Sequence, residues 1–227
     1  MALVGRVAAV YYFNTVKYKI TALKFQKSNR QRVNVYLDGK YAFGLAHIAA
    51  AWLKEGQEID DKKITKILQE DEQEKAYQRA LNYLSYRPRT EIEIHKKLKD
   101  YGVPEITITS VIKRLEENDL IDDKSFALSW IENRSDLRPR SRRMLSYELH
   151  QRGINQQIIN QTLEQINDQE LAYRAATKQA HKYKALEKIR FRKKMTGFLA
   201  RRGFNYDVIS EVLPMVWNEL KIDNEEN

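Results

Sequence analysis

Few acidic, histidine or cysteine side chains in this sequence have the spacing that catalysis or metal binding needs. Asp122 and Asp123 are the one tempting pair of carboxylates. Adjacent side chains diverge, however, and the start of a helix, with its N-cap position and favourable dipole, accounts for both. The histidines lie far apart, without the spacing of metal ligands or of a base beside a nucleophile. They are His47, His95, His150 and His181.

Other catalytic signatures are also missing from the sequence. The absence of cysteine excludes disulfides, zinc–thiolate sites and a thiol nucleophile. The eight glycines do not form a phosphate-binding loop, so neither an NTPase nor a dinucleotide enzyme is indicated. We therefore predict that the protein is not an enzyme and that it uses no cofactor and no metal.

Basic side chains are the remaining chemistry. The formal net charge of +9 and the pI of about 9.5 favour a polyanionic partner or a groove lined with acidic groups. The charge is clustered: Glu170 to Arg202 contains eleven Lys and Arg against two Glu, and RSDLRPRSRR forms a second block. Arginine offers bidentate geometry to carboxylates and phosphates. A solvated basic face that binds nothing is the alternative that the sequence leaves open.

The candidate partner-binding residues lie around predicted helix starts and in the basic block that follows Glu170. Positive charge at a helix start gains nothing from the helix dipole, which suggests another purpose for it. The candidates are Arg87, Arg89, Arg138, Arg140, Arg142, Arg143, Arg190, Lys193, Lys194, Arg201 and Arg202.

A threefold repeat positions these basic residues. Leu98, Leu149 and Leu199 are separated by 51 and 50 residues, and each is followed four residues later by a glycine. Glycine tolerates the left-handed conformation that ends a helix. Nine residues before each leucine stands an arginine, and an apolar stripe resumes after each glycine. A period near 50 residues is typical of tandem supersecondary units, here of about three helices each.

The helix boundaries follow from local chemistry. Thr90 and Glu93 match a capping box, in which each side chain satisfies a backbone donor of the first turn. Pro104 suits a first helical turn, and Asn155 and Asn205 occupy the matching place in the later copies as N-caps.

A period of two predicts a small β-module before the repeats. Three alternating apolar faces indicate a three-stranded meander, and keeping Leu37 opposite Tyr41 requires a three-residue connection through Asp38-Gly39-Lys40. The expected faces are Thr21, Leu23 and Phe25; Val33, Val35 and Leu37; and Tyr41, Phe43 and Leu45. Residues 1–19 are apolar, too short to span a bilayer and a poor secretory signal. They are either a β-extension or the product of an upstream start codon.

The predicted architecture is mainly α-helical, with three tandem three-helix repeats after the β-module. The predicted segments are 1–19 as an extension, 20–71 as the β-meander with a helix, 72–119, 120–167 and 168–221 as the repeats, and 222–227 as a disordered acidic tail.

Five blocks in order resemble regulatory protein RecX, in a longer form with an N-terminal β-module. They are ITALKFQ, RVNVYLDGKYAFG, ALNYLSYRPRTEIEIHKKL, LIDDKSFALSWIENR and FLARRGF, and the resemblance covers roughly residues 20–220. Copy three departs from the pattern, with Lys-Ile-Arg in place of Arg-Pro-Arg.

The resemblance implies a curved, elongated array of three-helix units that lies along the groove of the RecA filament on single-stranded DNA. It implies a non-catalytic, cytoplasmic and monomeric regulator that inhibits RecA ATPase, strand exchange and co-protease activity in recombination, DNA repair and the SOS response. The residues alone leave a second reading open, a module whose basic three-helix units bind DNA directly.

Overall fold

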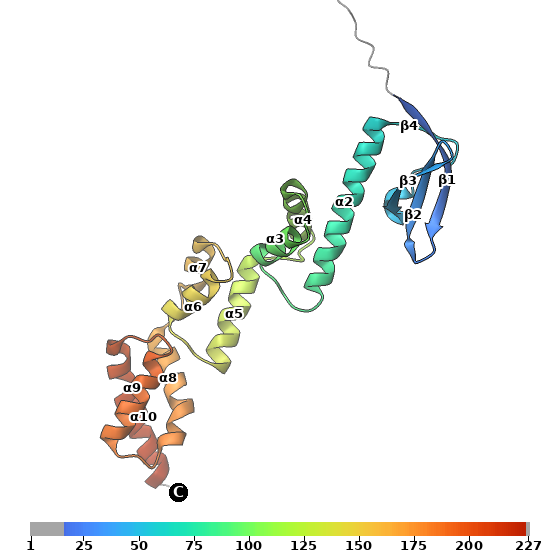
Figure 1. Ribbon diagram of the computed structural model, residues 1–227. Coiled ribbons are helices and arrows are strands. Elements are labelled where there is room, and N and C mark those ends of the chain that lie inside the picture. Colours follow the sequence, from blue (N-terminus) through green and yellow to red (C-terminus); the bar gives the residue numbers. More distant parts are fainter. Residues whose placement is uncertain (1–15, 226–227) are drawn as a thin grey trace, which may run out of the picture. The chain divides into compact units, whose positions relative to one another are not determined.

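The computed structural model describes residues 16–225, with side chains up to residue 221, and divides the chain into two units (Figure 1). The first unit contains Met1–Leu81 with Val103–Val111, and the second contains Asn82–Gly102 with Ile112–Asn227. Most of the predicted extension lies outside the described residues, and its last residues, from Lys17, already belong to the first strand.

The β-module is a four-stranded antiparallel sheet rather than the predicted three-stranded meander. Strands β1 (Lys17–Gln26), β2 (Asn29–Leu37) and β3 (Lys40–Ala46) are joined by β4 (Glu58–Asp60), in the order β3-β2-β1-β4. Three residues of β4 pair with the start of β1, and Ile59 is buried. A strand with one inward apolar residue gives no visible alternation, which is why the sequence pattern missed it.

The predicted register between β2 and β3 is wrong by one residue. Leu37 pairs with Lys40, so only Asp38 and Gly39 form the connection, with φ of 49° and 81°. Positive φ at both positions is the type I′ geometry that Asp-Gly favours between twisted strands. An irregularity between Val35 and Tyr36 then returns the later pairs to a common face.

The core face of β1 also differs from the predicted Thr21, Leu23 and Phe25. Ile20 is fully buried and Leu23 packs on the core, because the register shifts between Ile20 and Ala22. Phe25 remains exposed. Val33, Val35 and Leu45 complete the predicted apolar centre of the sheet, and Tyr41 lies outside it.

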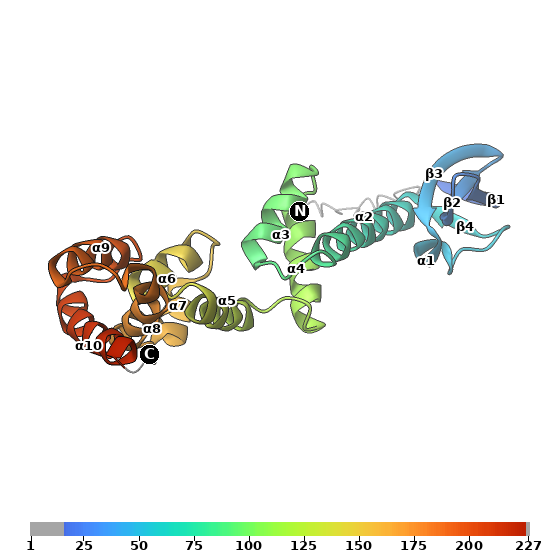
Figure 2. The ribbon, with the colours of Figure 1, turned by 90° about the horizontal axis from the view of Figure 1, so that it is seen from below.

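Helix α1 (His47–Ala50) lies between β3 and β4 in the chain and beside the sheet in Figure 2, and α2 (Asp61–Leu84) follows β4. The predicted boundary at residue 71 falls inside α2, because the sequence between Asp61 and Leu84 contains no glycine, proline or cap that would end a helix. Asp71 is instead buried and accepts hydrogen bonds or ion pairs from the Ala46 backbone N–H, Arg32 and Lys75.

The helices after α2 follow the predicted threefold repeat. They are α3 (Glu91–Asp100), α4 (Glu105–Glu117), α5 (Asp123–Leu137), α6 (Arg142–His150), α7 (Gln156–Leu163), α8 (Asp168–Ala180), the 3₁₀ turn η1 (His181–Tyr183), α9 (Lys188–Ala200) and α10 (Tyr206–Glu225). Glycines end α3, α6 and α9 with positive φ at residues 102, 153 and 203, as predicted.

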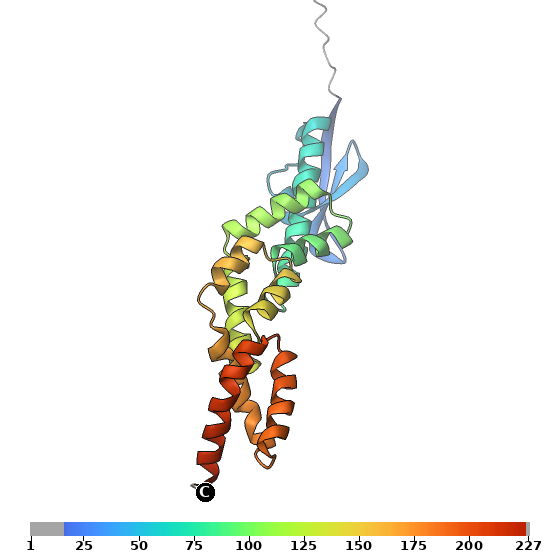
Figure 3. The same ribbon diagram turned by 90° about the vertical axis from the view of Figure 1, so that its left-hand side faces the viewer.

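One apolar core joins the second and third repeats. Leu145, Leu149, Phe191, Met195 and Leu199 are almost fully buried in it. Helices α8, α9 and α10 lie side by side in Figures 1 and 3. Helix α10 continues to Glu225, so most of the predicted disordered tail is helical. No helix within residues 16–225 combines the length and the apolar character that a membrane span requires.

Candidate functional site

The junction between the first and second repeats lies within the second unit and places α3 against the end of α6. Thr90 caps α3 by accepting from the Glu93 N–H at 3.3 Å, and its hydroxyl donates to the carbonyl of Arg152 at 2.8 Å. Gly153 lies so close to α3 that an added Cβ would be 2.1 Å from Ile92 Cγ2. This position therefore requires glycine for two reasons: the left-handed backbone conformation and the close approach of two repeats.

The next junction repeats this arrangement with α6 and the end of α9. Ser141 caps α6, and its backbone N–H donates to the carbonyl of Arg202 at 3.0 Å. A Cβ at Gly203 would lie 2.5 Å from Ser141 Oγ. This junction brings the basic block 138–143 together with Arg201 and Arg202, although the two segments are about 60 residues apart in the chain.

Carboxylates from the following repeat complete both junctions. The N–H of Glu91, the first residue of α3, donates to Asp123 at 3.0 Å, and the N–H of Arg142, the first residue of α6, donates to Asp168 at 2.6 Å. Asp122 is the N-cap of α5, as predicted, and accepts from Lys124 and Ser125. The Asp122-Asp123 pair therefore serves helix ends and repeat contacts.

The pKa directions of these carboxylates differ with their surroundings. Hydrogen bonds from Ser125 lower the pKa of Asp122. Burial raises the pKa of Asp123, against the hydrogen bond from Glu91, and neighbouring carboxylates raise it further. Burial, followed by repulsion from Glu116 and Asp123, raises the pKa of Glu91.

Three arginines converge on Glu93, whose side chain is 19% exposed. Arg87, Arg89 and Arg152 place their nitrogens 3.0, 3.8 and 3.2 Å from its oxygens. Only half of the predicted capping box is formed. The Thr90 side chain accepts from the Glu93 N–H, but the Glu93 carboxylate binds guanidinium groups. Arg89 also stacks on Tyr83 at 4.0 Å and is itself only 14% exposed. Two predicted partner-binding residues, Arg87 and Arg89, therefore have partners inside the molecule.

A second cluster surrounds Glu148 and Trp130. Glu148 binds Arg140, Arg134 at 2.9 Å and the indole Nε1–H of Trp130 at 3.0 Å. The guanidinium groups of Arg134 and Arg152 lie 4.3 and 3.9 Å from the centre of the Trp130 ring, within the range of cation–π attraction. Burial lowers the pKa of Arg152, and Glu93 opposes this shift.

Arg202 also has an intramolecular role. It donates to the carbonyl of Pro139 at 2.9 Å and stacks on Phe198 at 4.4 Å. Its pKa is lowered by burial and then by the nearby positive charges of Arg140 and Arg138. The junction therefore brings three arginine side chains near one another.

The remaining predicted residues are exposed, and their side chains make no ion pair with the part of the chain that the structure describes. They are Arg138, Arg142, Arg143, Arg190, Lys193, Lys194 and Arg201. Arg138, Arg142, Arg143 and Arg201 flank the α6–α9 junction, and we call these four residues the junction patch.

Helix α9 carries the other exposed group. At 100° per residue, Lys194 and Lys193 lie about 40° and 60° from Arg190, on either side of it. The buried Phe191, Met195 and Leu199 form a face centred about 150° away from these three cations. Arg190 itself lies inside α9, whereas Arg89 and Arg140 precede their helices, so copy three starts its second helix earlier than the repeat predicts.

Comparison with known proteins shows the family. Four family models match in order: the regulatory protein RecX N-terminal domain at residues 18–60, and the first, second and third RecX three-helix domains at 76–115, 122–163 and 167–213. Regulatory protein RecX of Limosilactobacillus reuteri (strain DSM 20016) is 37% identical over 205 residues, covering 86% of this chain and 77% of the relative. This chain belongs to the RecX family.

Other RecX proteins extend the match. Regulatory protein RecX of Bacillus subtilis (strain 168) is 33% identical over 213 residues, covering 91% of this chain and 80% of that protein. A crystal structure of regulatory protein RecX matches with a TM-score of 0.68 at 35% identity, covering 86% and 98% of the two chains. RecX from Lactobacillus salivarius matches with a TM-score of 0.56 at 29% identity, covering 67% of this chain and 98% of that one. The three predicted helical repeats are thus the three RecX three-helix domains.

The predicted partner-binding residues fall into two groups according to their contacts and exposure. Arg87, Arg89, Arg140 and Arg202 have partners within the molecule, and the exposed ones cluster on the second and third domains. The sequence patterns placed Trp130 on an apolar stripe and Arg134 at the repeat position of Arg87, and they did not indicate that both contact Arg152 or Glu148. Arg152 had a visible signal, because it precedes its glycine in LHQRGI as Arg202 does in LARRGF.

Proposed function

We propose that this RecX-family chain binds the RecA filament on single-stranded DNA and inhibits its ATPase, strand exchange and co-protease activity. Membership of a family of regulatory proteins supports the regulatory role. The observation that carries the binding surface is the junction patch, together with Arg190, Lys193 and Lys194 on α9: seven exposed cations on two consecutive domains. We propose that the chain acts as a cytoplasmic monomer, without catalysis or cofactor of its own.

Surface cations that form no ion pair within the described residues fit a partner that carries phosphates and carboxylates. An exposed ion pair contributes about 0–1 kcal/mol, so these residues add little to stability. In an interface the same side chains form charge-assisted hydrogen bonds, which are roughly twice as strong as neutral ones. Arg89, Arg140 and Arg202 would lose existing partners on binding, so we assign this contact to the exposed group.

Charge reversal of the exposed group tests this proposal. We expect Arg142→Glu with Arg143→Glu, and separately Lys193→Glu with Lys194→Glu, to leave the unfolding free energy within about 0.5 kcal/mol, as is usual for surface changes. Both pairs should weaken inhibition of RecA ATP hydrolysis on single-stranded DNA, and reversal should weaken it more than alanine because it adds repulsion. A matched control is Lys62→Glu with Lys63→Glu, on the exposed start of α2. Unchanged inhibition by both folded pairs would refute the assignment.

Direct binding to DNA is the second candidate, favoured by the same exposed charge. Binding to duplex DNA without RecA would then weaken by about 0.9 log units per log salt for each phosphate neutralised. If the two reversals abolish this salt-dependent binding and leave filament inhibition unchanged, the patch serves DNA and not the filament.

A further inference from the structure

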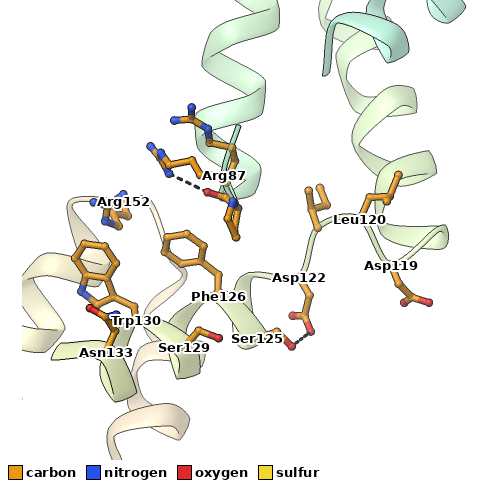
Figure 4. A pocket seen from close by; sticks show the side chains of 13 residues that line it. Arg87, Asp119, Leu120, Asp122, Ser125, Phe126, Ser129, Trp130, Asn133 and Arg152 are labelled. Atoms are coloured by element: carbon orange, nitrogen blue, oxygen red, sulfur yellow. Dashed lines mark hydrogen bonds between the residues drawn. The ribbon is translucent and has the colours of Figure 1, made fainter. Parts of the chain in front are cut away.

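A hollow of about 780 Å³ opens within the second unit, and its lining includes no residue of α9 (Figure 4). It lies between residues 87–89, the connection from α4 to α5, and one face of α5. Ligand sites in proteins commonly measure about 300–1,000 Å³. The N-cap of α5 and one face of that helix line the hollow, at a spacing of three and four residues. These residues are Asp122, Ser125, Phe126, Ser129, Trp130 and Asn133.

The hollow has an apolar floor and charged groups of opposite sign on two sides. Phe126, Leu120 and Ile121 supply apolar surface. In Figure 4 the guanidinium groups of Arg87 and Arg152 lie on one side, the carboxylates of Asp119 and Asp122 lie on the other, and the Phe126 ring lies between them.

The basic side carries excess charge. Arg87, Arg89 and Arg152 share the single carboxylate of Glu93, so three positive charges face one negative charge. The side chain of Arg87 is 42% exposed and can meet a second anion without leaving Glu93. On the other side Asp122 stays ionised, because its hydrogen bonds from Ser125 lower its pKa.

This charge pattern fits a peptide segment better than a nucleic acid. A strand of phosphates that crossed the hollow would bring negative charge against Asp119 and Asp122. The Trp130 ring already carries Arg134 and Arg152, and its N–H is bound to Glu148, so it offers no free stacking platform for a base. A peptide supplies what both sides need: a carboxylate for the arginines and backbone N–H groups for the aspartates.

We propose that this hollow receives an apolar side chain of a protein partner, with a neighbouring carboxylate of that partner bound by Arg87 and Arg152. The inference rests on the proposed function, since the partner meant is the RecA protein of the filament. It adds a second contact whose chemistry differs from that of the exposed cations.

A substitution that fills the hollow tests the proposal. Ser129 is exposed within it, and Glu132 is an exposed residue of α5 outside its lining, which makes Ser129→Trp and Glu132→Trp a matched pair. We expect Ser129→Trp to weaken binding to the RecA filament at least tenfold, to leave binding to bare single-stranded DNA unchanged, and to melt like the parent. Glu132→Trp should bind like the parent. Equal filament binding by folded Ser129→Trp overturns the proposal, and an equal loss on bare DNA overturns it in favour of a nucleic-acid occupant.

A second measurement needs no RecA and separates this inference from the proposed function. The indole N–H resonance of Trp130 is followed while N-acetyl-Asp-Phe-amide, N-acetyl-Asn-Phe-amide or thymidine 5′-monophosphate is added. We expect a saturable shift with the Asp peptide, a smaller one with the Asn peptide, and none in Ser129→Trp. No shift with the Asp peptide, or a larger shift with the nucleotide, overturns the proposal. If the peptide binds but the parent chain does not bind the filament, the proposed function fails and the hollow remains a peptide site.

Discussion

Gly153→Ala is the sharpest test of how the domains are joined. Gly153 has φ of +79°, and a Cβ there would lie 2.1 Å from Cγ2 and 2.7 Å from Cβ of Ile92. Gly102 has nearly the same φ, +73°, but a Cβ there meets nothing within 4 Å. The two glycines therefore share the conformational constraint and differ in the space around them.

The expected cost follows from these two terms. A non-glycine residue in the left-handed region costs about 1–2 kcal/mol, which is the whole cost expected for Gly102→Ala. Overpacking adds about 1–3 kcal/mol, so Gly153→Ala should destabilise the second unit by about 2–5 kcal/mol. Ile92 is half exposed, so truncating it is mild. Ile92→Ala removes the 2.1 Å contact but keeps the Cβ at 2.7 Å, so it should recover part of the overpacking cost in the double variant.

The assay is urea unfolding of the four variants, followed by the fluorescence of Trp130 in a Trp52→Phe, Trp217→Phe background. We expect a coupling energy of about 0.5–3 kcal/mol between Gly153→Ala and Ile92→Ala, the range typical of residues in contact. Additive effects of the two substitutions, or an equal cost of Gly102→Ala and Gly153→Ala, would refute the packing argument.

Three further predictions concern the same junctions. Thr90→Val should lower the unfolding free energy more than Ser141→Ala does, as measured by thermal unfolding. Ser141→Ala removes a helix cap worth about 0.5–2 kcal/mol. Thr90→Val removes a cap and also leaves the Arg152 carbonyl without its hydroxyl donor, which costs about 1–3 kcal/mol more. The reverse order would contradict the Thr90 contact. Asp122→Asn and Asp123→Asn should have opposite effects at pH 7. The ionised form of Asp122 is favoured by folding, so its loss destabilises, whereas the raised pKa of Asp123 means that its charge opposes folding and its removal does not destabilise. In pH-dependent melts, the difference in stability between each variant and the parent should vanish as the pH falls below the pKa of the carboxyl that was replaced. Changes in stability of the same sign at pH 7 would contradict the assignment. Arg140→Glu should destabilise markedly because it faces Glu148, while Arg142→Glu should melt like the parent; equal melting temperatures would show that the Arg140 ion pair contributes nothing.

The sequence determined the features whose physics is local. The threefold repeat, the glycine terminators and the caps at Thr90, Asn155 and Asn205 depend on residues within one or two helical turns. Apolar periodicity likewise located β1, β2, β3 and the core helices, since side chains alternate along a strand and recur on one face of a helix. The RecX resemblance rested on these same local blocks.

The tertiary structure decided every feature that depends on residues far apart in the chain. The ion pair between Glu93 and Arg152 spans 59 residues, and the Arg202 to Pro139 hydrogen bond spans 63. No periodicity shows whether an arginine meets a carboxylate or solvent. The sequence did not predict the bulges in β1 and β3 for the same reason, because the register of a strand depends on its neighbour in the sheet. Basic composition therefore predicted a charged surface, and only packing separated the arginines that pair across the domain junctions from those left exposed.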